Sequence, residues 1–227
     1  MKILSLSTAE QGASLAFFDQ GRLVCEEYWT SKVTHSRRLL SMVDDLLVNK
    51  AEVALSQVDG FVAAKGPGSF TGLRIGISMV KGFAFAMSKP CVGVSSLDGL
   101  GWRFCNSDLP VCAMMDARRG EVYTAVYRFS RGKLVKKSRE KVCSPEEALR
   151  AAGQESMLYA GSGSKAYREL IENVSPGTAV ICPESMDYIS AVALAQPVLA
   201  DAGFFTRQEN SLIPFYIRKS DAEINFS

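Results

Sequence analysis

Histidine is almost absent from this chain of 227 residues: His35 is the single one, and its isolation excludes several kinds of catalytic site. Metal-binding motifs that require two histidines, such as His-Glu-x-x-His, cannot form. A Ser-His-Asp triad would have to use His35, which lies at the start of a predicted amphipathic helix. A histidine in a first helical turn is usually exposed or caps the helix, so a catalytic role is the less favoured interpretation.

Paired cysteines and long apolar runs are lacking as well. The six cysteines never come closer than seven positions, which leaves no Cys-x-x-Cys pair and disfavours both a zinc site and a disulfide framework. No run approaches the ~18 apolar residues of a membrane span. The apolar part of residues 1–9 is too short for a signal peptide. We therefore expect a cytoplasmic protein that makes no membrane contact and holds no metal.

Excess charge is scarce, because 26 basic residues nearly balance 24 acidic ones and leave a net charge of +2. Proteins that bind nucleic acid by themselves usually show clustered basic charge. The exception is residues 131–141, where basic residues alternate with others. This pattern predicts the solvated side of a strand pair, with RNA contact as the alternative. The basic residues are Arg131, Lys133, Lys136, Lys137, Arg139 and Lys141.

Glycine, by contrast, is concentrated in residues 66–76, which read GPGSFTGLRIG and follow an apolar run. A strand that turns through glycines into a helix is a common place for phosphate binding. A P-loop would need Lys-Ser or Lys-Thr where Leu73 and Arg74 stand. A dinucleotide fingerprint would need a glycine at Thr71. The segment therefore either binds another ligand or packs against a neighbour.

The two halves of the chain resemble each other at an offset of 109 to 111 residues, which indicates an internal repeat. Each half shows three strands, a helix, a strand and a helix, and Ser144 with Glu147 predicts a capped helix start in the second half. We therefore predict an α/β protein of two tandem ribonuclease-H-like lobes, each a mixed sheet flanked by helices. This is the architecture of the actin, Hsp70 and sugar-kinase ATPases. The first turn of each lobe carries an acid there, but here Asp116 is matched by Ser7.

Residues 66–76 together with residues 116–123, DARRGEVY, closely resemble the TsaB (YeaZ) family. The similarity covers most of the chain and includes residues 34–40, 93–97 and 214–218. Ser7 departs from the family, which usually has Asp before Thr8. The resemblance implies a first lobe over residues 1–100 and a second over 101–227, with the C-terminal tail packing back on the first.

The resemblance also implies a non-catalytic subunit in the synthesis of threonylcarbamoyladenosine in tRNA. TsaB forms a heterodimer with the catalytic TsaD, and the ATPase TsaE joins the pair. ATP and metal are then expected on the partner subunits, and this chain is expected to contact tRNA only as part of the complex. Whether the isolated chain is a homodimer stays open. The metal motif of TsaD, His-x-x-x-His, cannot form here, which also disfavours the older peptidase label of this superfamily.

The first lobe is implied to contact its partner through two helices, over residues 35–49 and 72–87. Gly72 and Gly76 are four residues apart, and small residues at that spacing let another helix approach closely. That helix belongs either to a partner or to this chain's own residues 35–49. The expected partner-contact residues are His35, Arg38, Leu39, Met42, Gly72, Leu73, Gly76 and Val80.

A second group of residues is expected to contact a ligand or the assembled complex. Its members are Ser69, Thr71, Arg74, Asp116, Arg118 and Glu121. The alternatives are plain: Ser69 and Thr71 as turn or cap residues, Arg74 as an exposed arginine, and Arg118 with Glu121 as a surface ion pair. Two rival functions stay open, an ATP-dependent phosphotransferase of the two-lobed superfamily and a module that binds tRNA by itself.

Overall fold

The computed structural model describes residues 1–30, 38–153, 155–201, 203–207 and 212–218. Two compact units divide the chain. Unit 1 comprises Met1–Gly99 and Ile189–Tyr216, and unit 2 comprises Leu100–Tyr188 and Ile217–Ser227. The sequence predicts a second lobe over residues 101–227 whose C-terminal tail packs back on the first lobe. Ile189–Tyr216 instead groups with unit 1, because it supplies a helix that covers the first sheet.

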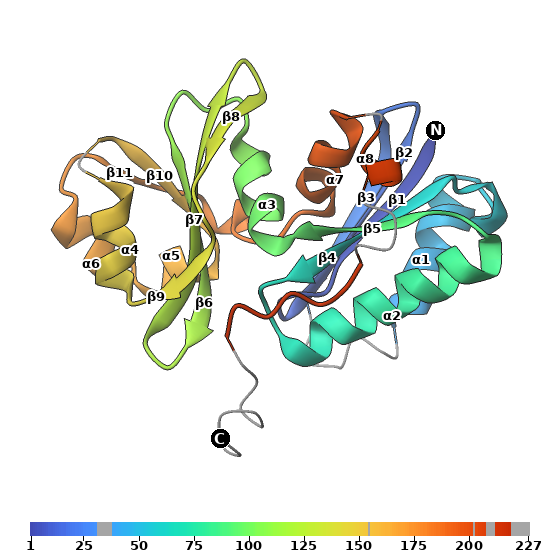
Figure 1. Cartoon of the computed structure of the whole chain (residues 1–227), viewed down its shortest axis with the longest axis horizontal. Coiled ribbons are helices and arrows are strands. Elements are labelled where there is room, and N and C mark those ends of the chain that lie inside the picture. Colours follow the sequence, from blue (N-terminus) through green and yellow to red (C-terminus); the bar gives the residue numbers. More distant parts are fainter. Residues whose placement is uncertain (31–37, 154, 202, 208–211, 219–227) are drawn as a thin grey trace. The chain divides into compact units, whose positions relative to one another are not determined.

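Unit 1 is built on a five-stranded mixed sheet in the order β3-β2-β1-β4-β5 (Figure 1). The first three strands are antiparallel neighbours, and β4 and β5 run parallel to β1. The central strands β1 and β2 are buried along nearly their whole length, as expected of a sheet covered on both faces. The strands are β1 (Lys2–Ser7), β2 (Gly12–Asp19), β3 (Arg22–Thr30), β4 (Gly60–Gly66) and β5 (Cys91–Ser95).

Helices cover both faces of this sheet. On one face lie α2 and α1 with its π-helical continuation: the Cys25 thiol of β3 reaches the Leu46 carbonyl there. On the other face lies α7, whose Ala191 N–H donates to the Ser14 hydroxyl of β2. The helices are α1 (Leu39–Asp44), its continuation (Asp45–Lys50), α2 (Phe70–Met87), α3 (Ser96–Gly101), α7 (Ala191–Leu199) and α8 (Phe204–Arg207).

The long helix α2 has a buried side and an exposed side. Leu73, Ile77, Val80 and Ala84 are buried against the sheet, but only 33% of the residues of this 18-residue helix are buried. By length and composition alone α2 is the one described helix that could cross a membrane, although the sequence reading found no apolar run of that length. Its buried stripe identifies it as a helix that packs on a protein core.

Unit 2 repeats the same strand order. Its six-stranded sheet runs β11-β10-β6-β7-β8, with β9 also paired to β7, and read from β8 this is the order of unit 1. The predicted pair of lobes with mixed sheets is therefore confirmed. The strands are β6 (Val111–Arg118), β7 (Glu121–Ser130), β8 (Lys133–Lys137), β9 (Lys141–Cys143), β10 (Met157–Ala160) and β11 (Ala179–Ile181).

The repeat extends to the hairpin turns. Gln20-Gly21 joins β2 to β3, and Arg131-Gly132 joins β7 to β8, each as a two-residue loop. Their φ angles are 50° and 77° in the first and 50° and 73° in the second. Consecutive positive φ angles define the type I′ turn that suits a twisted hairpin. The offset of 111 residues seen in the sequence thus reflects one backbone conformation used twice.

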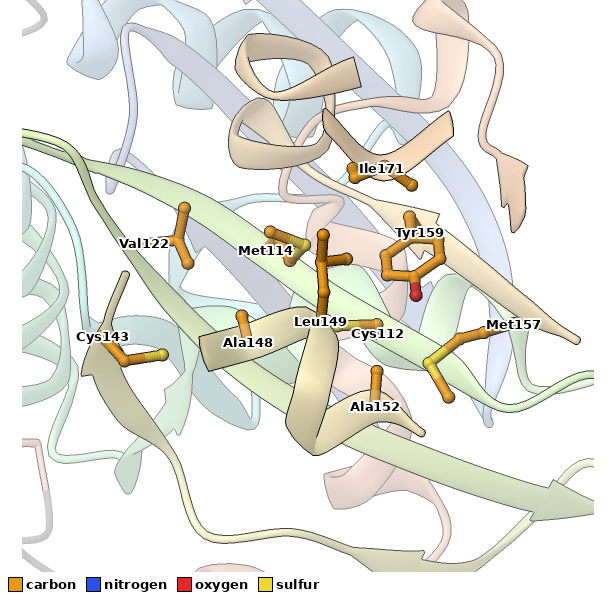
Figure 2. Packing of buried hydrophobic residues seen from close by; sticks show 10 residues of the cluster. All are labelled: Cys112, Met114, Val122, Cys143, Ala148, Leu149, Ala152, Met157, Tyr159 and Ile171. Atoms are coloured by element: carbon orange, nitrogen blue, oxygen red, sulfur yellow. The ribbon is translucent and has the colours of Figure 1, made fainter. Parts of the chain in front are cut away.

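The core of unit 2 lies between its sheet and helices α4 and α6. Figure 2 shows Leu149 and Ala152 of α4 beside Cys112 and Tyr159 of the sheet. Burial raises the pKa of the Cys112 thiol to about 11, so this cysteine acts as a small apolar residue. The helices are α4 (Pro145–Ala152), α5 (Ser162–Ala166) and α6 (Arg168–Val174).

The helix boundaries of unit 2 test the sequence reading. The Ser144 hydroxyl accepts from the Glu147 N–H at 3.2 Å, which confirms the predicted capped start of α4. The glycine-rich residues 161–164 do not form a long turn, because α5 already begins at Ser162. Gly161 alone makes the turn, at φ 111°, where a Cβ would lie 2.3 Å from the Met114 carbonyl oxygen.

Asp187 ties the end of β10 to the loop that leaves unit 2. Its carboxylate accepts a hydrogen bond from the Gly161 N–H and lies 3.9 Å from the Cys182 sulfur. Burial raises the pKa of this carboxyl above its ordinary value, although the Gly161 N–H acts in the opposite direction. Folding therefore makes the charged form of Asp187 less favourable than it is in the unfolded chain.

This environment predicts how Asp187→Asn changes stability with pH. A raised folded pKa contributes stability that is fully present below the unfolded pKa, near 3.9, and is lost as pH rises through the folded pKa. The amide keeps the acceptor for Gly161 without a charge. We expect the variant to be more stable than the wild type at pH 7, with the gain shrinking toward pH 4, as measured by urea unfolding.

Glu184→Gln serves as the control in the same segment. The partner Lys165 lowers the pKa of exposed Glu184, so the expected trend has the opposite sign, a loss at pH 7 that vanishes in acid. An Asp187→Asn protein that is less stable than the wild type at every pH would contradict the raised pKa of the buried Asp187 carboxyl.

Candidate functional site

The turn between β4 and α2 is filled by the chain itself. Gly66 has φ 120°, and a Cβ there would lie 2.3 Å from the Phe215 carbonyl oxygen. Gly68 has φ 155°, and a Cβ there would lie 2.4 Å from the Ala9 carbonyl oxygen. Both glycines therefore let other backbone segments of unit 1 approach closely. Backbone atoms of Phe215 and Ala9 therefore pack directly against this turn.

Two amide groups of this segment, those of Ser69 and Gly72, are hydrogen-bonded within the chain. The Ser69 N–H donates to the Ala9 carbonyl at 2.7 Å. The Ser69 hydroxyl accepts from the Gly72 N–H at 3.2 Å, so Ser69 is the N-cap of α2, as its alternative interpretation expected. Thr71 lies exposed in the first turn of α2. Of the two interpretations open for this segment, the geometry favours packing.

Gly72 and Gly76 pack on the end of β1. A Cβ at Gly72 would lie 2.0 Å from the Thr8 carbonyl oxygen, and one at Gly76 would lie 2.4 Å from the Thr8 hydroxyl. That hydroxyl donates to the Gly72 carbonyl at 2.7 Å. The expectation that these glycines admit a helix, from a partner or from residues 35–49, is therefore wrong. The space beside Gly72 and Gly76 is occupied by Thr8, which follows β1 in the same unit.

Four more of the expected partner-contact residues are buried in unit 1. Leu39, Met42, Leu73 and Val80 are between 0 and 8% exposed. Side chains this deeply buried hold the helices on the sheet and cannot touch another protein directly. Arg38 is exposed, with its guanidinium 5.2 Å from the centre of the Trp29 ring. His35 lies outside the described residues.

The outer sides of the same helices carry large apolar residues instead. Leu40 is 58% exposed, Val48 51% and Phe85 89%. We call these three residues the outer helix face. The sequence contained a signal for them, because they are the apolar positions that fall outside the buried stripe of each helix. Large exposed apolar side chains of this kind are candidates for an interaction surface.

Arg74 is held by two aromatic residues. Its guanidinium carbon lies 3.7 Å from the centre of the Phe70 ring, and its Nε donates to the Tyr216 hydroxyl at 3.3 Å. The Phe70 and Tyr216 rings are 5.1 Å apart. The Phe215 N–H donates to the Lys65 carbonyl at 2.6 Å and continues this attachment. Arg74 thus fastens residues 212–216 to the start of α2.

In unit 2, the β6–β7 hairpin carries the remaining predicted site residues. Arg118, Arg119 and Gly120 have φ angles of 60°, 56° and 75°, a left-handed run that two arginines rarely adopt. The Arg118 N–H donates to Asp116 Oδ1 at 2.8 Å, which supports this conformation. The hairpin tip is exposed, so this strained backbone conformation places the side chains of two arginines in solvent.

Glu121 pairs with a residue that the sequence reading missed. Arg218 donates to the Glu121 carboxylate and, at 2.9 Å, to the Ala117 carbonyl. The expected ion pair of Glu121 with Arg118 is therefore replaced by one that spans 97 positions. No local pattern predicts such a pair. The resemblance over residues 214–218 was the signal that this segment matters.

The two positions expected to hold acids differ in environment. Ser7, in unit 1, is 2% exposed, and its hydroxyl accepts from the Ala9 N–H at 3.4 Å. Asp116, in unit 2, is exposed, and its N–H donates to the Ser162 hydroxyl at 3.1 Å. Among the residues that the structure describes, no three His, Cys, Asp or Glu side chains gather closely enough to hold a metal ion.

The repeated strand order defines a two-lobed ribonuclease-H-like protein, and comparison with known proteins narrows this class. The family described as TsaD, tRNA N6-adenosine threonylcarbamoyltransferase, matches residues 30–226. The chain belongs to this family.

The most informative relatives carry the TsaB and YeaZ names. The chain is 29% identical to the Bacillus subtilis tRNA threonylcarbamoyladenosine biosynthesis protein TsaB, over 98% of this chain and 96% of that protein. It is 37% identical to Escherichia coli TsaB over 56% of this chain and 55% of that protein. The solved structure of YeaZ from Pseudomonas aeruginosa matches with a TM-score of 0.77 and 31% identity, covering 95% of this chain and all of that one.

Replacement of glycine by alanine should have opposite effects on stability at Gly76 and at Gly82, because only Gly76 packs against another segment. Alanine gains about 1 kcal/mol over glycine in a helix interior. At Gly82 nothing lies within 4 Å of a new Cβ, so Gly82→Ala should raise stability by roughly that amount. At Gly76 the Cβ meets Thr8, so Gly76→Ala should lower stability by about 1–3 kcal/mol. Urea unfolding of both variants measures the difference.

A Gly76→Ala protein as stable as Gly82→Ala would show that the end of β1 does not confine this helix. The same geometry implies that Gly76→Phe prevents unit 1 from folding, so that substitution is unsuitable as a probe of partner binding.

Proposed function

We propose that this chain is a non-catalytic subunit of the machinery that makes threonylcarbamoyladenosine in tRNA. Its relatives are named as biosynthesis proteins of this modified nucleoside, and the matching family is named for the transferase. In this proposal the chain binds and activates a TsaD-like catalytic subunit, and a TsaE-like ATPase joins them. ATP, metal and the transfer chemistry belong to the partners. Assembly of this kind takes place in the cytoplasm.

One observation carries the non-catalytic part of the proposal. The β4–α2 turn, which in other proteins holds phosphate, is closed by Thr8, Ala9 and Phe215 of the same unit. The neighbouring acid position holds Ser7, which is buried and accepts a hydrogen bond from the Ala9 N–H. A phosphotransferase would need an open cradle and a carboxylate for its metal at this place.

The outer helix face supports the partner-binding part. Leu40, Val48 and Phe85 expose apolar surface on two helices whose inner sides are already used by the sheet. A protein interface gains most from large residues that become fully buried on association. The buried residues first assigned to contact, such as Leu73, then act indirectly by fixing the two helices. A second copy of this chain competes for the same face when the partner is absent.

Phe85→Lys tests this interface. The site lies in the last turn of α2, where a lysine suits the helix dipole, so folding should be unaffected. Burying the new charge at an interface should cost about 2 kcal/mol or more, which weakens association at least about tenfold. Val174→Lys is the matched control, an exposed apolar residue in the last turn of α6. Affinity for the TsaD-like subunit is measured by calorimetry.

Reconstitution connects this interface to the modification. Purified TsaD-like and TsaE-like proteins, tRNA and the threonylcarbamoyl adenylate are combined with the wild-type chain or with either variant. We expect modified tRNA with the wild type and Val174→Lys, and a strong loss with Phe85→Lys that excess chain restores. Full modification without this chain would overturn the proposed role. Unchanged affinity of Phe85→Lys would move the interface to another surface.

Mg-ATP distinguishes the subunit from a phosphotransferase. A ligand present at 100 times its dissociation constant stabilises a native protein by about 2.7 kcal/mol. For a chain of this size that corresponds to a rise in Tm of roughly 5–10 °C. We expect a shift under about 1 °C for the isolated chain with 1 mM Mg-ATP, because the turn has no room for phosphate. A large shift would favour the phosphotransferase.

A further inference from the structure

A cavity in unit 2 lies between α4 and the outer strands of the sheet. Small residues line it, among them Thr124 of β7 and Ala148 and Ala152 of α4. Basic residues from β7, from β8, from the segment that follows β8 and from β9 line it as well. These are Arg128, Lys136, Arg139 and Lys141. Four cations around one cavity on a chain of nearly neutral charge point to an anionic ligand.

Two of these four cations have acidic partners. Arg128 forms a forked pair with the Glu155 carboxylate, and Lys141 binds Glu147 at 2.7 Å. Among the described residues, no ion pair involves Lys136 or Arg139. The cavity therefore has two cations whose charge is not neutralised by a neighbouring carboxylate. Each can gain a charge-assisted bond to a ligand oxygen without breaking an existing pair.

The backbone holds these two side chains in place. Between them Ser138 pairs twice with Val126 of β7: its N–H donates to the Val126 carbonyl, and its hydroxyl accepts from the Val126 N–H, both at 2.9 Å. Residue 136 in turn lies opposite Arg128 in the β7–β8 register. The strand segment that presents Lys136 and Arg139 is thus fixed before any ligand arrives.

The basic residues continue beyond the cavity. Lys133 begins β8 and Arg131 lies in its type I′ turn, and both are exposed. A strand of five residues is about 16 Å long, so cations are distributed over a distance longer than a single phosphate. An extended row of cations leading to a cavity suits a chain of phosphates better than one small anion.

We propose that this surface, the cavity with β8 and its turn, binds the phosphodiester backbone of RNA. The proposal rests on the proposed function, because the RNA that such a subunit meets is the tRNA held by the complex. Lys136 and Arg139 contact phosphate oxygens, while Arg128 and Lys141 stay paired with their carboxylates beside them. Phosphate contacts of this kind position a nucleic acid without reading its sequence. The net charge of +2 makes the surface effective only when a partner contributes binding as well.

Protection of a sheet edge is the competing explanation. β8 is an edge strand, and lysines on an edge strand prevent pairing with other sheets. That role accounts for Lys133 and Lys137. It does not account for Arg128, which lies on β7, the strand next to the edge strand, and which also lines the cavity.

The test is the affinity of tRNA for the reconstituted complex of this chain with its TsaD-like partner. Lys136→Gln/Arg139→Gln removes the two unpaired cations, and Arg22→Gln/Lys89→Gln removes the same charge from unit 1. Binding is measured by fluorescence anisotropy from 50 to 300 mM salt. We expect the first variant to bind about tenfold more weakly, with the salt slope reduced by roughly 1.5, and the control to stay within twofold.

Size-exclusion chromatography of each complex keeps this test separate from the proposed function. If the wild-type chain forms no complex, the proposed function fails. If both variants form complexes and bind tRNA equally well, the RNA surface is refuted and the subunit role stands. Aggregation of the first variant with unchanged tRNA affinity would assign the lysines to edge protection.

Inorganic phosphate at 10 mM distinguishes a small-anion site. Phosphate that stabilises the wild type but not Lys136→Gln/Arg139→Gln, together with equal tRNA affinities, would overturn the RNA proposal in favour of a small anion.

Discussion

The contact of Thr8 with the first turns of α2 is the constraint on which unit 1 depends. The Thr8 hydroxyl donates to the Gly72 carbonyl, and its atoms occupy the space that side chains at Gly72 and Gly76 would need. Because the end of β1 fits there, α2 lies close to the sheet and its glycine turn is closed. The same approach directs Leu73 and Val80 inward and leaves Phe85 outward. One close backbone contact thus both closes the glycine turn and decides which side of the helix stays exposed.

Much of the fold could be predicted from the sequence because its signals are local. The offset between the halves, the hairpin at Gln20-Gly21 and the Ser144 cap each depend on a few neighbouring residues. The site was harder. Glycines four apart on a helix allow close approach from any direction, and only the structure identifies Thr8 as the neighbour. The ion pair of Arg218 with Glu121 joins segments far apart in the chain, and no repeating pattern in the sequence indicates it.

The two units use similar strands for different surfaces. In unit 1 the helices on one sheet face present apolar residues such as Phe85, and in unit 2 the strands beside α4 present cations such as Lys136. The hairpin turns illustrate the divergence: Gln20 and Arg131 have the same φ of 50°, but only the second is charged. A repeated backbone thus carries an apolar surface in one copy and a basic surface in the other, which matches a subunit that binds protein and nucleic acid at separate places.

The order of the chain has a consequence for how the protein forms during synthesis. The strands and helices of unit 2 lie in one continuous stretch, Leu100–Tyr188, whereas unit 1 needs Ile189–Tyr216. Until those residues leave the ribosome, the β2 face that meets α7 stays uncovered and the β4–α2 turn lacks Phe215. The second half of the chain can therefore reach its folded state before the first, reversing the usual N-terminal-first order. Ribosomes that stop near residue 188 would release a chain in which unit 2 lacks only its last segment, which carries Arg218, while the sheet of unit 1 stays open.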